Sequence, residues 1–192
     1  IFYQLMAKNF EQAFALWPVW QSQYKIYNAN RVIGHFLRNN DRASVISLLQ
    51  HLALAMPTSV STFDRLATVY QQDQQFQQAQ KYRLKVEQLL NELFSKTLSL
   101  QQEGSLNRYG YGLLQEKRTQ AAISVFKRIT KANPNSVNAY DSLADAYESA
   151  KNYPEAINAL EKAIVIAANK ENVSTASFQQ KLNRLKNIET SD

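Results

Sequence analysis

The sequence predicts an all-α protein built from repeated pairs of antiparallel helices. The chain has 192 residues with only four glycines and four prolines, whereas turn-rich sheet proteins usually need more of both. A second observation is that residue size recurs along the chain at a step of about 34 residues. Ala122 and Phe126 are followed one step later by Ala156 and Leu160, so small positions stay small and large positions stay large.

The same step holds in the N-terminal half of the chain. Val32 is followed one step later by Leu66. At the start of the chain, residues 7–13 (AKNFEQA) repeat the pattern of residues 150–156 (AKNYPEA). Both segments are expected to be joints between two helices, so the chain is expected to open in the last turns of a first helix.

The small and large residues have different roles in such a helix pair. Gly110 and Ala144 let the two helices of a pair approach closely, whereas Phe126 and Tyr147 fill the space between turns and neighbouring pairs. One pair cannot bury its apolar face, but stacked pairs form a continuous core. Between pairs, residues 133–136 (NPNS) end one helix at a proline and offer a serine N-cap to the next.

This period and residue pattern resemble the tetratricopeptide-repeat (TPR) family. The resemblance implies an all-α, TPR-type α-solenoid of antiparallel helix pairs with a C-terminal capping helix. It also implies a non-catalytic scaffold, in which a concave groove lined by the first helix of each pair holds another protein or a peptide. In the two clearest repeats the pattern is carried by Leu106, Tyr109, Gly110, Leu113, Ala122, Phe126, Ile129 and Pro134, and then by Tyr140, Leu143, Ala144, Tyr147, Ala156, Leu160 and Ala163.

The repeats divide into two predicted domains. The N-terminal half, residues 1–102, holds a partial repeat at 1–25, repeats at 26–59 and 60–93, and a helical extension. The C-terminal half, residues 103–192, holds repeats at 103–136 and 137–170 and a capping helix at 174–189. The capping helix is expected because Phe178, Leu182, Leu185 and Ile188 fall at helical spacing. A membrane-surface helix is a weaker alternative, since it needs a larger apolar face.

The regular step is interrupted between the second and third repeats. The equivalent positions Leu66 and Tyr109 are separated by one step plus nine further residues. Residues 79–102 contain no glycine or proline, which predicts one long helix there. Nine residues add about 2.5 helical turns, so we expect a break in the superhelix near residues 95–104. The same long helix could form a homodimer as a short coiled coil.

No catalytic constellation emerges from the sequence. The chain has no cysteine, and its two histidines, His35 and His51, are isolated, so neither thiolate chemistry nor a histidine-based metal site is expected. Ser47 lies one helical turn from His51, but no aspartate is placed to orient that histidine. Gly-rich nucleotide loops and nucleophile elbows are also missing from the sequence. We therefore predict that the chain is not an enzyme, with no catalytic residue, metal, cofactor or small-molecule substrate.

The TPR resemblance places a partner-binding groove on the first helix of each pair. Asparagine, threonine and tyrosine side chains there can pair with an extended peptide backbone. Asp141, Asp145 and Glu148 form an acidic row that favours a basic or amine-bearing segment. The expected groove residues are Asp64, Thr68, Asn107, Tyr111, Asn138, Asp141 and Asp145.

Two aromatic features bear on partners and on the core. Phe14, Trp17 and Trp20 recur at helical spacing near the N-terminus. They are expected to pack in the core, with an exposed partner edge as the alternative. The glutamine-rich segment 71–80 is expected to be ordered, with Phe76 at a core position of its second helix.

Charge and hydropathy restrict the remaining partners. The formal net charge is +6 and the isoelectric point is about 9.4, a balance that can attract nucleic acid. Lysine and arginine are mixed with acidic residues, and the expected groove is polar to acidic, so RNA binding is a remote alternative. No apolar run approaches the ~20 residues of a membrane span. The sequence is compatible with a location in the bacterial cytoplasm or in the periplasm, and any targeting signal is expected upstream of Ile1.

A narrower resemblance covers residues 104–188. The segments LNRYGYGLL at 106–114 and FQQKL at 178–182 resemble the repeat tail that follows the catalytic domain in some bacterial serine hydrolases, including esterases. This resemblance implies a bacterial source. It also offers an alternative function, as an accessory or dimerisation module of a larger hydrolase.

Overall fold

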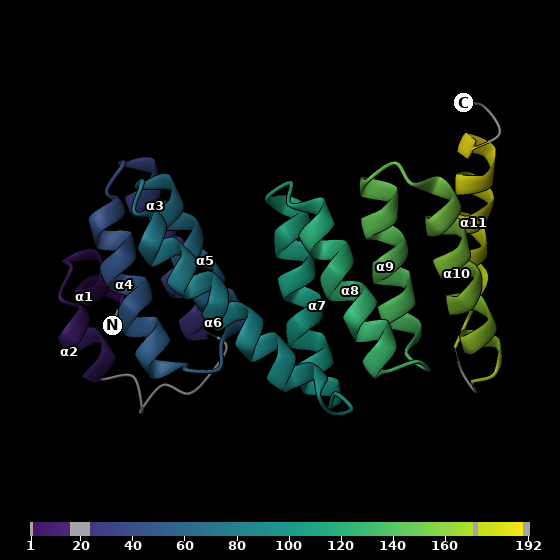
Figure 1. The fold of residues 1–192 in the computed structure, drawn as a ribbon, viewed down its shortest axis with the longest axis horizontal. Coiled ribbons are helices and arrows are strands. Elements are labelled where there is room, and N and C mark those ends of the chain that lie inside the picture. The colour runs from purple at the N-terminus through teal and green to yellow at the C-terminus, as the bar shows by residue number, and fades with distance from the viewer. Residues whose placement is uncertain (1, 16–23, 171–172, 190–192) are drawn as a thin grey trace. The chain divides into compact units, whose positions relative to one another are not determined.

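The computed structural model describes residues 2–15, 24–170 and 173–189, and these residues form eleven α-helices and no strand (Figure 1). The all-α fold class is confirmed, and the helices form the antiparallel pairs of a TPR-type architecture. The helices are α1 (Phe2–Met6), α2 (Phe10–Ala15), α3 (Tyr24–Arg38), α4 (Arg42–Ala55), α5 (Val60–Gln72), α6 (Phe76–Phe94), α7 (Leu100–Gln115), α8 (Thr119–Ala132), α9 (Val137–Ser149), α10 (Tyr153–Ala168) and α11 (Ala176–Glu189).

The chain divides into two compact units, Ile1–Asn91 and Glu92–Asp192. The first unit contains α1 to α5 and most of α6, and the second contains the end of α6 and α7 to α11. In the second unit α7 to α10 form two successive helix pairs, and α11 packs on α10 as the capping helix (Figure 1). The segment 71–80 is ordered as the end of α5 and the start of α6.

The turns inside the helix pairs share one backbone conformation. At each of five turns one residue has a φ between 55° and 62°, and none of the five is glycine. At the last of them the Lys151 N–H donates to the Glu148 carbonyl at 2.8 Å, and the Asn152 N–H donates to the Tyr147 carbonyl at 2.9 Å. This pair of bonds is the Schellman motif, which satisfies the last carbonyls of a helix. The five left-handed residues are Lys8, Asn40, Gln74, Lys117 and Lys151.

The turns between pairs use serine caps instead. The hydroxyl oxygens of Ser59, Ser99 and Ser136 each accept a backbone N–H three residues further on, at 3.4, 3.2 and 3.1 Å. These bonds occupy N–H groups that have no partner inside the helix. The N-cap expected at Ser136 is therefore confirmed.

The prediction of one long helix over residues 79–102 is wrong. α6 ends at Phe94 and α7 begins at Leu100. Ser99 and Gln102 form a capping box, in which each side chain bonds the backbone N–H of the other residue, and this arrangement starts a new helix without proline or glycine. A homodimer through a continuous 79–102 helix is therefore not supported by this fold.

The core is built from the expected small and large residues. In the second unit Ala122, Ala144 and Phe126 are fully buried. A Cβ atom placed on Gly110 would lie 2.5 Å from the Phe126 ring, so α7 and α8 approach this closely only because position 110 has no side chain. The core position expected for Phe76 is wrong, because this residue is 59% exposed at the first position of α6 and the buried face of α6 starts one turn later.

Candidate functional site: a polar row on alternate helices

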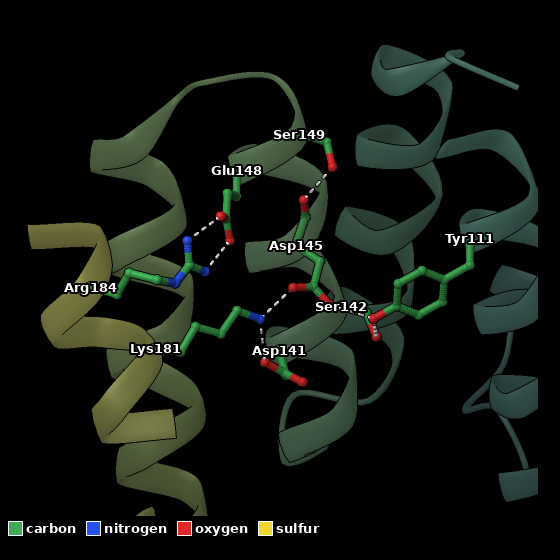
Figure 2. A network of polar contacts seen from close by, with 8 residues as sticks. All are labelled: Tyr111, Asp141, Ser142, Asp145, Glu148, Ser149, Lys181 and Arg184. Atoms are coloured by element: carbon green, nitrogen blue, oxygen red, sulfur yellow. Dashed lines mark hydrogen bonds and ion pairs between the residues drawn. The ribbon is translucent and has the colours of Figure 1, made fainter. Parts of the chain in front are cut away.

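A row of polar side chains joins α7, α9 and α11 (Figure 2). The Tyr111 hydroxyl on α7 donates to the Asp145 carboxylate on α9 at 2.6 Å and lies 3.3 Å from the Ser142 hydroxyl. The Lys181 ammonium on α11 donates to Asp141 at 2.8 Å and also to Asp145. Tyr111 and Asp145 are one repeat step apart in the sequence, so the repeat itself brings these positions onto one face.

The capping helix supplies the cations of this row. Leu182 and Leu185 are buried, which fixes the rotation of α11. This rotation places Lys181 and Arg184, three residues apart on one helix face, against α9. The Arg184 guanidinium donates two bonds to the Glu148 carboxylate, at 2.6 and 2.8 Å, in the two-pronged geometry that favours arginine over lysine.

The electrostatics hold the tyrosine and the lysine of the row each in one protonation state near neutral pH. Burial works to lower the pKa of Lys181, but the hydrogen bonds to Asp141 and Asp145 outweigh it, so this pKa is raised. Burial raises the pKa of Tyr111 far above its usual range, and the hydrogen bond to Asp145 raises it further. The row therefore contains a neutral tyrosine donor and a charged lysine.

The seven expected groove residues are distributed over both units. Asp64 is buried in the first unit, and the half-buried Thr68 donates its hydroxyl to the Asp64 backbone carbonyl at 3.0 Å. The other five lie in the second unit. There, Asn138 is exposed and Asn107 is half-buried, and the Asn107 Oδ1 atom has no hydrogen-bond partner among the described residues.

The structure shows an ion pairing within the chain that the sequence pattern did not indicate. Asp141 and Asp145 were expected to meet a partner's basic groups, and in this structure they bind Lys181 of the same chain. The sequence did contain a signal for this pairing. Lys181 follows Asp145, and Arg184 follows Glu148, by the same number of residues. Of the expected partner edge, Trp17 and Trp20 lie outside the described residues. Phe14 belongs to α2, but its side chain is not described.

A second polar cluster holds the start of α7 in place. Glu103 is buried and accepts hydrogen bonds from Asn133 and Ser136 in the turn between α8 and α9. The Asn133 amide also bonds both the N–H and the carbonyl of Leu98, at 3.2 Å each. All of these groups are occupied with one another, so the cluster positions helices and offers no open site.

The described residues contain no group of three or more metal-binding side chains. The His51 Nδ1 atom bonds the Ser47 backbone carbonyl at 2.8 Å, so this pair is a local helix contact rather than a nucleophile with its base. Among the described residues, no helix has the length and the apolar character needed to cross a membrane.

Comparison with a family model supports the repeat assignment for residues 113–177. Residues 113–177 match the tetratricopeptide-repeat family model. Similar solved structures include MamA from Desulfovibrio magneticus RS-1, with 20% identity over 85% of this chain and 84% of that chain and a TM-score of 0.45. Another is a putative kinesin light chain with TPR-like repeats from Podosopora anserina, with 16% identity over 87% of each chain and a TM-score of 0.47.

A third similar structure is the TPR2B domain of yeast Sti1 in complex with pHsp70. Its identity is 15% over 86% of this chain and 98% of that chain, and the TM-score is 0.37. No curated protein matches the chain significantly. The fold and the matched segment define a class, an all-α protein of TPR-type helix pairs. Within the chain, the matched tetratricopeptide-repeat region runs from the end of α7 to the start of α11.

Proposed function

We propose that this chain is a non-catalytic scaffold that binds another protein or a peptide on the face shared by α7 and α9. The observation that carries this proposal is the polar row, in which alternate helices align hydrogen-bonding side chains on one face. Tyrosine, asparagine and carboxylate groups on such a face can pair with the backbone and the basic side chains of an extended segment.

The helices beneath this face also suit a binding role. Ser142 is 1% exposed, and Leu143 and Ala146 are buried under the α9 surface, so the polar side chains stand on a packed helix. Side chains held by a packed scaffold lose little conformational entropy when a ligand binds. By contrast, no observation favours the accessory role in a serine hydrolase or RNA binding over this proposal.

The test compares two arginine substitutions on exposed positions. Asn138→Arg places a long cation on the α7–α9 face, and Ser124→Arg places the same side chain on the exposed surface of α8. Each tagged full-length protein is used to capture partners from extracts of the source organism. A partner of this face should be captured by the wild type and by Ser124→Arg, and its yield should fall at least tenfold with Asn138→Arg.

Two results would contradict the proposal. Equal capture by both variants would place the partner elsewhere on the molecule. Failure of the wild type to retain any protein above a bead control would argue against a scaffold function. Circular dichroism and thermal unfolding of both variants should match the wild type, because neither position is buried.

A further inference from the structure

We infer that α11 is a displaceable ligand of the α9 surface, and that the partner of this surface presents a basic amphipathic helix of the same pattern. This inference rests on the proposed function and names the chemistry of the partner. The pattern is Lys-Leu-x-Arg-Leu, as found at residues 181–185. Its cations pair with the acidic row Asp141, Asp145 and Glu148, and its leucines face the last helix pair.

The acidic row on α9 is matched to a helix that carries cations three residues apart. Lys181 reaches both Asp141 and Asp145, and Arg184 reaches Glu148 one turn further along (Figure 2). A third cation, Lys186, pairs with Glu161 on α10 at 2.8 Å. The α9 surface therefore fits a helix whose positive charges have this spacing, and α11 shows how such a helix is bound.

The attachment of α11 combines a small apolar contact with ion pairs to α9 and α10. Only Leu182 and Leu185 are buried on this helix, whereas α10 buries six residues. The Arg184 side chain is 50% exposed and the Lys186 side chain 49% exposed. Partly exposed ion pairs are screened by salt and contribute modestly, and the apolar contact is smaller than that of α10. A competing helix with the same leucines and the same charges can therefore replace α11.

The covalent link changes the competition only through effective concentration. A short tether holds α11 near the α9 surface at an effective concentration in the millimolar range. A free helix therefore binds the wild type weakly, and binding strengthens when the tethered copy is detached. A partner that also contacts the α7–α9 face binds more tightly than a free helix, and can therefore displace the tethered α11 from the α9 surface.

The experiment uses a fluorescent peptide of residues 174–189 and the full-length chain. The variant Lys181→Glu/Arg184→Glu repels its own α11 from the acidic row. The peptide should bind this variant at least tenfold more tightly than it binds the wild type. A control peptide with the same two glutamates should not bind either protein.

Equal binding of the peptide to both proteins, or no binding to the variant, would overturn the inference. If the variant fails to fold, amide exchange in the wild type decides. The α11 amides should then exchange at least tenfold faster than those of α10, and faster still at high salt than at low salt. Equal protection of the two helices at both salt concentrations would overturn displacement.

Two further readouts separate the possible occupants and the two proposals. A wild-type dimer that disappears in Lys181→Glu/Arg184→Glu would assign the surface to α11 of a second copy and overturn a different partner. Asn138→Arg tests partner binding on the α7–α9 face without breaking any ion pair of α11. If Asn138→Arg loses the partner but the peptide does not bind Lys181→Glu/Arg184→Glu, this inference is refuted while the proposed function stands.

Discussion

At residue scale the close approach of α7 and α8 depends on one glycine. We expect Gly110→Ala to destabilise the protein by about 1–3 kcal/mol, because the new methyl group would meet the fully buried Phe126 ring at 2.5 Å. Gly112→Ala in the same helix is the matched control, since its added Cβ would meet nothing within 4 Å apart from the adjoining residues and the backbone of its own helix. It should stabilise the protein by about 0.5–1 kcal/mol. Urea unfolding of both variants checks the contrast, and equal effects would contradict it.

The first unit contains a carboxylate whose contribution to stability depends on pH. The hydrogen bond from Lys8 and those from Ser44 lower the pKa of Asp41 from 3.8 to about 2. Because the folded pKa is lower than the unfolded one, the stabilisation is fully present above about pH 4 and is lost as the pH falls through 2. Asp41→Asn should therefore be less stable than the wild type at pH 6, and the difference should shrink by pH 2.5. A difference that stays constant over this range in urea titrations would refute the assignment.

Individual residues differ in how far the sequence alone could place them. The small residue at Gly110 and the serine cap at Ser136 follow from the repeat and from capping chemistry, and both are confirmed. The pairing of Asp141 with Lys181 was not predicted, because periodicity aligns equivalent positions but does not decide which charges meet between helices distant in the sequence. That pairing depends on how α11 is rotated, which is set by burial of its leucines.

At element scale the turns inside the helix pairs store strain that glycine can release. Lys151 has a φ of 57°, which costs a residue with a Cβ about 1–2 kcal/mol relative to the right-handed region. We expect Lys151→Gly to raise the free energy of unfolding by about 0.5–1 kcal/mol. Lys162→Gly, an exposed position inside α10, should instead lower it by about 1 kcal/mol. Destabilisation by both substitutions would show that the left-handed conformation at Lys151 is not strained.

The helix boundaries show what the sequence signals could and could not supply. The repeat step predicted the helix pairs, and the left-handed residues Asn40 and Gln74, like Lys117 and Lys151, lie one such step apart. The helix predicted across the nine-residue insertion was wrong, because that prediction rested on the lack of glycine and proline in residues 79–102. A capping box can begin a helix without either residue, and the Ser99 and Gln102 pair was the signal present in the sequence.

At the scale of the whole molecule, the chain consists of two compact units, and the polar row belongs to the second. The repeat arithmetic predicted the fold class because each helix pair is stabilised mainly by its neighbours. The acidic row was also predicted, as a set of positions on one face of one helix. Its occupation by α11 could not be predicted, since a capping helix is expected in any such stack and its contacts depend on packing.

Photo-cross-linking in cells shows whether a partner protein lies against the face shared by α7 and α9. A photoreactive phenylalanine analogue is placed at Asn138 in one full-length protein and at Ser124 in another, and both are irradiated in cells of the source organism. We expect a cross-linked protein adduct from position 138 and none from position 124. An adduct from position 124 alone, or the same adduct from both positions, would contradict it.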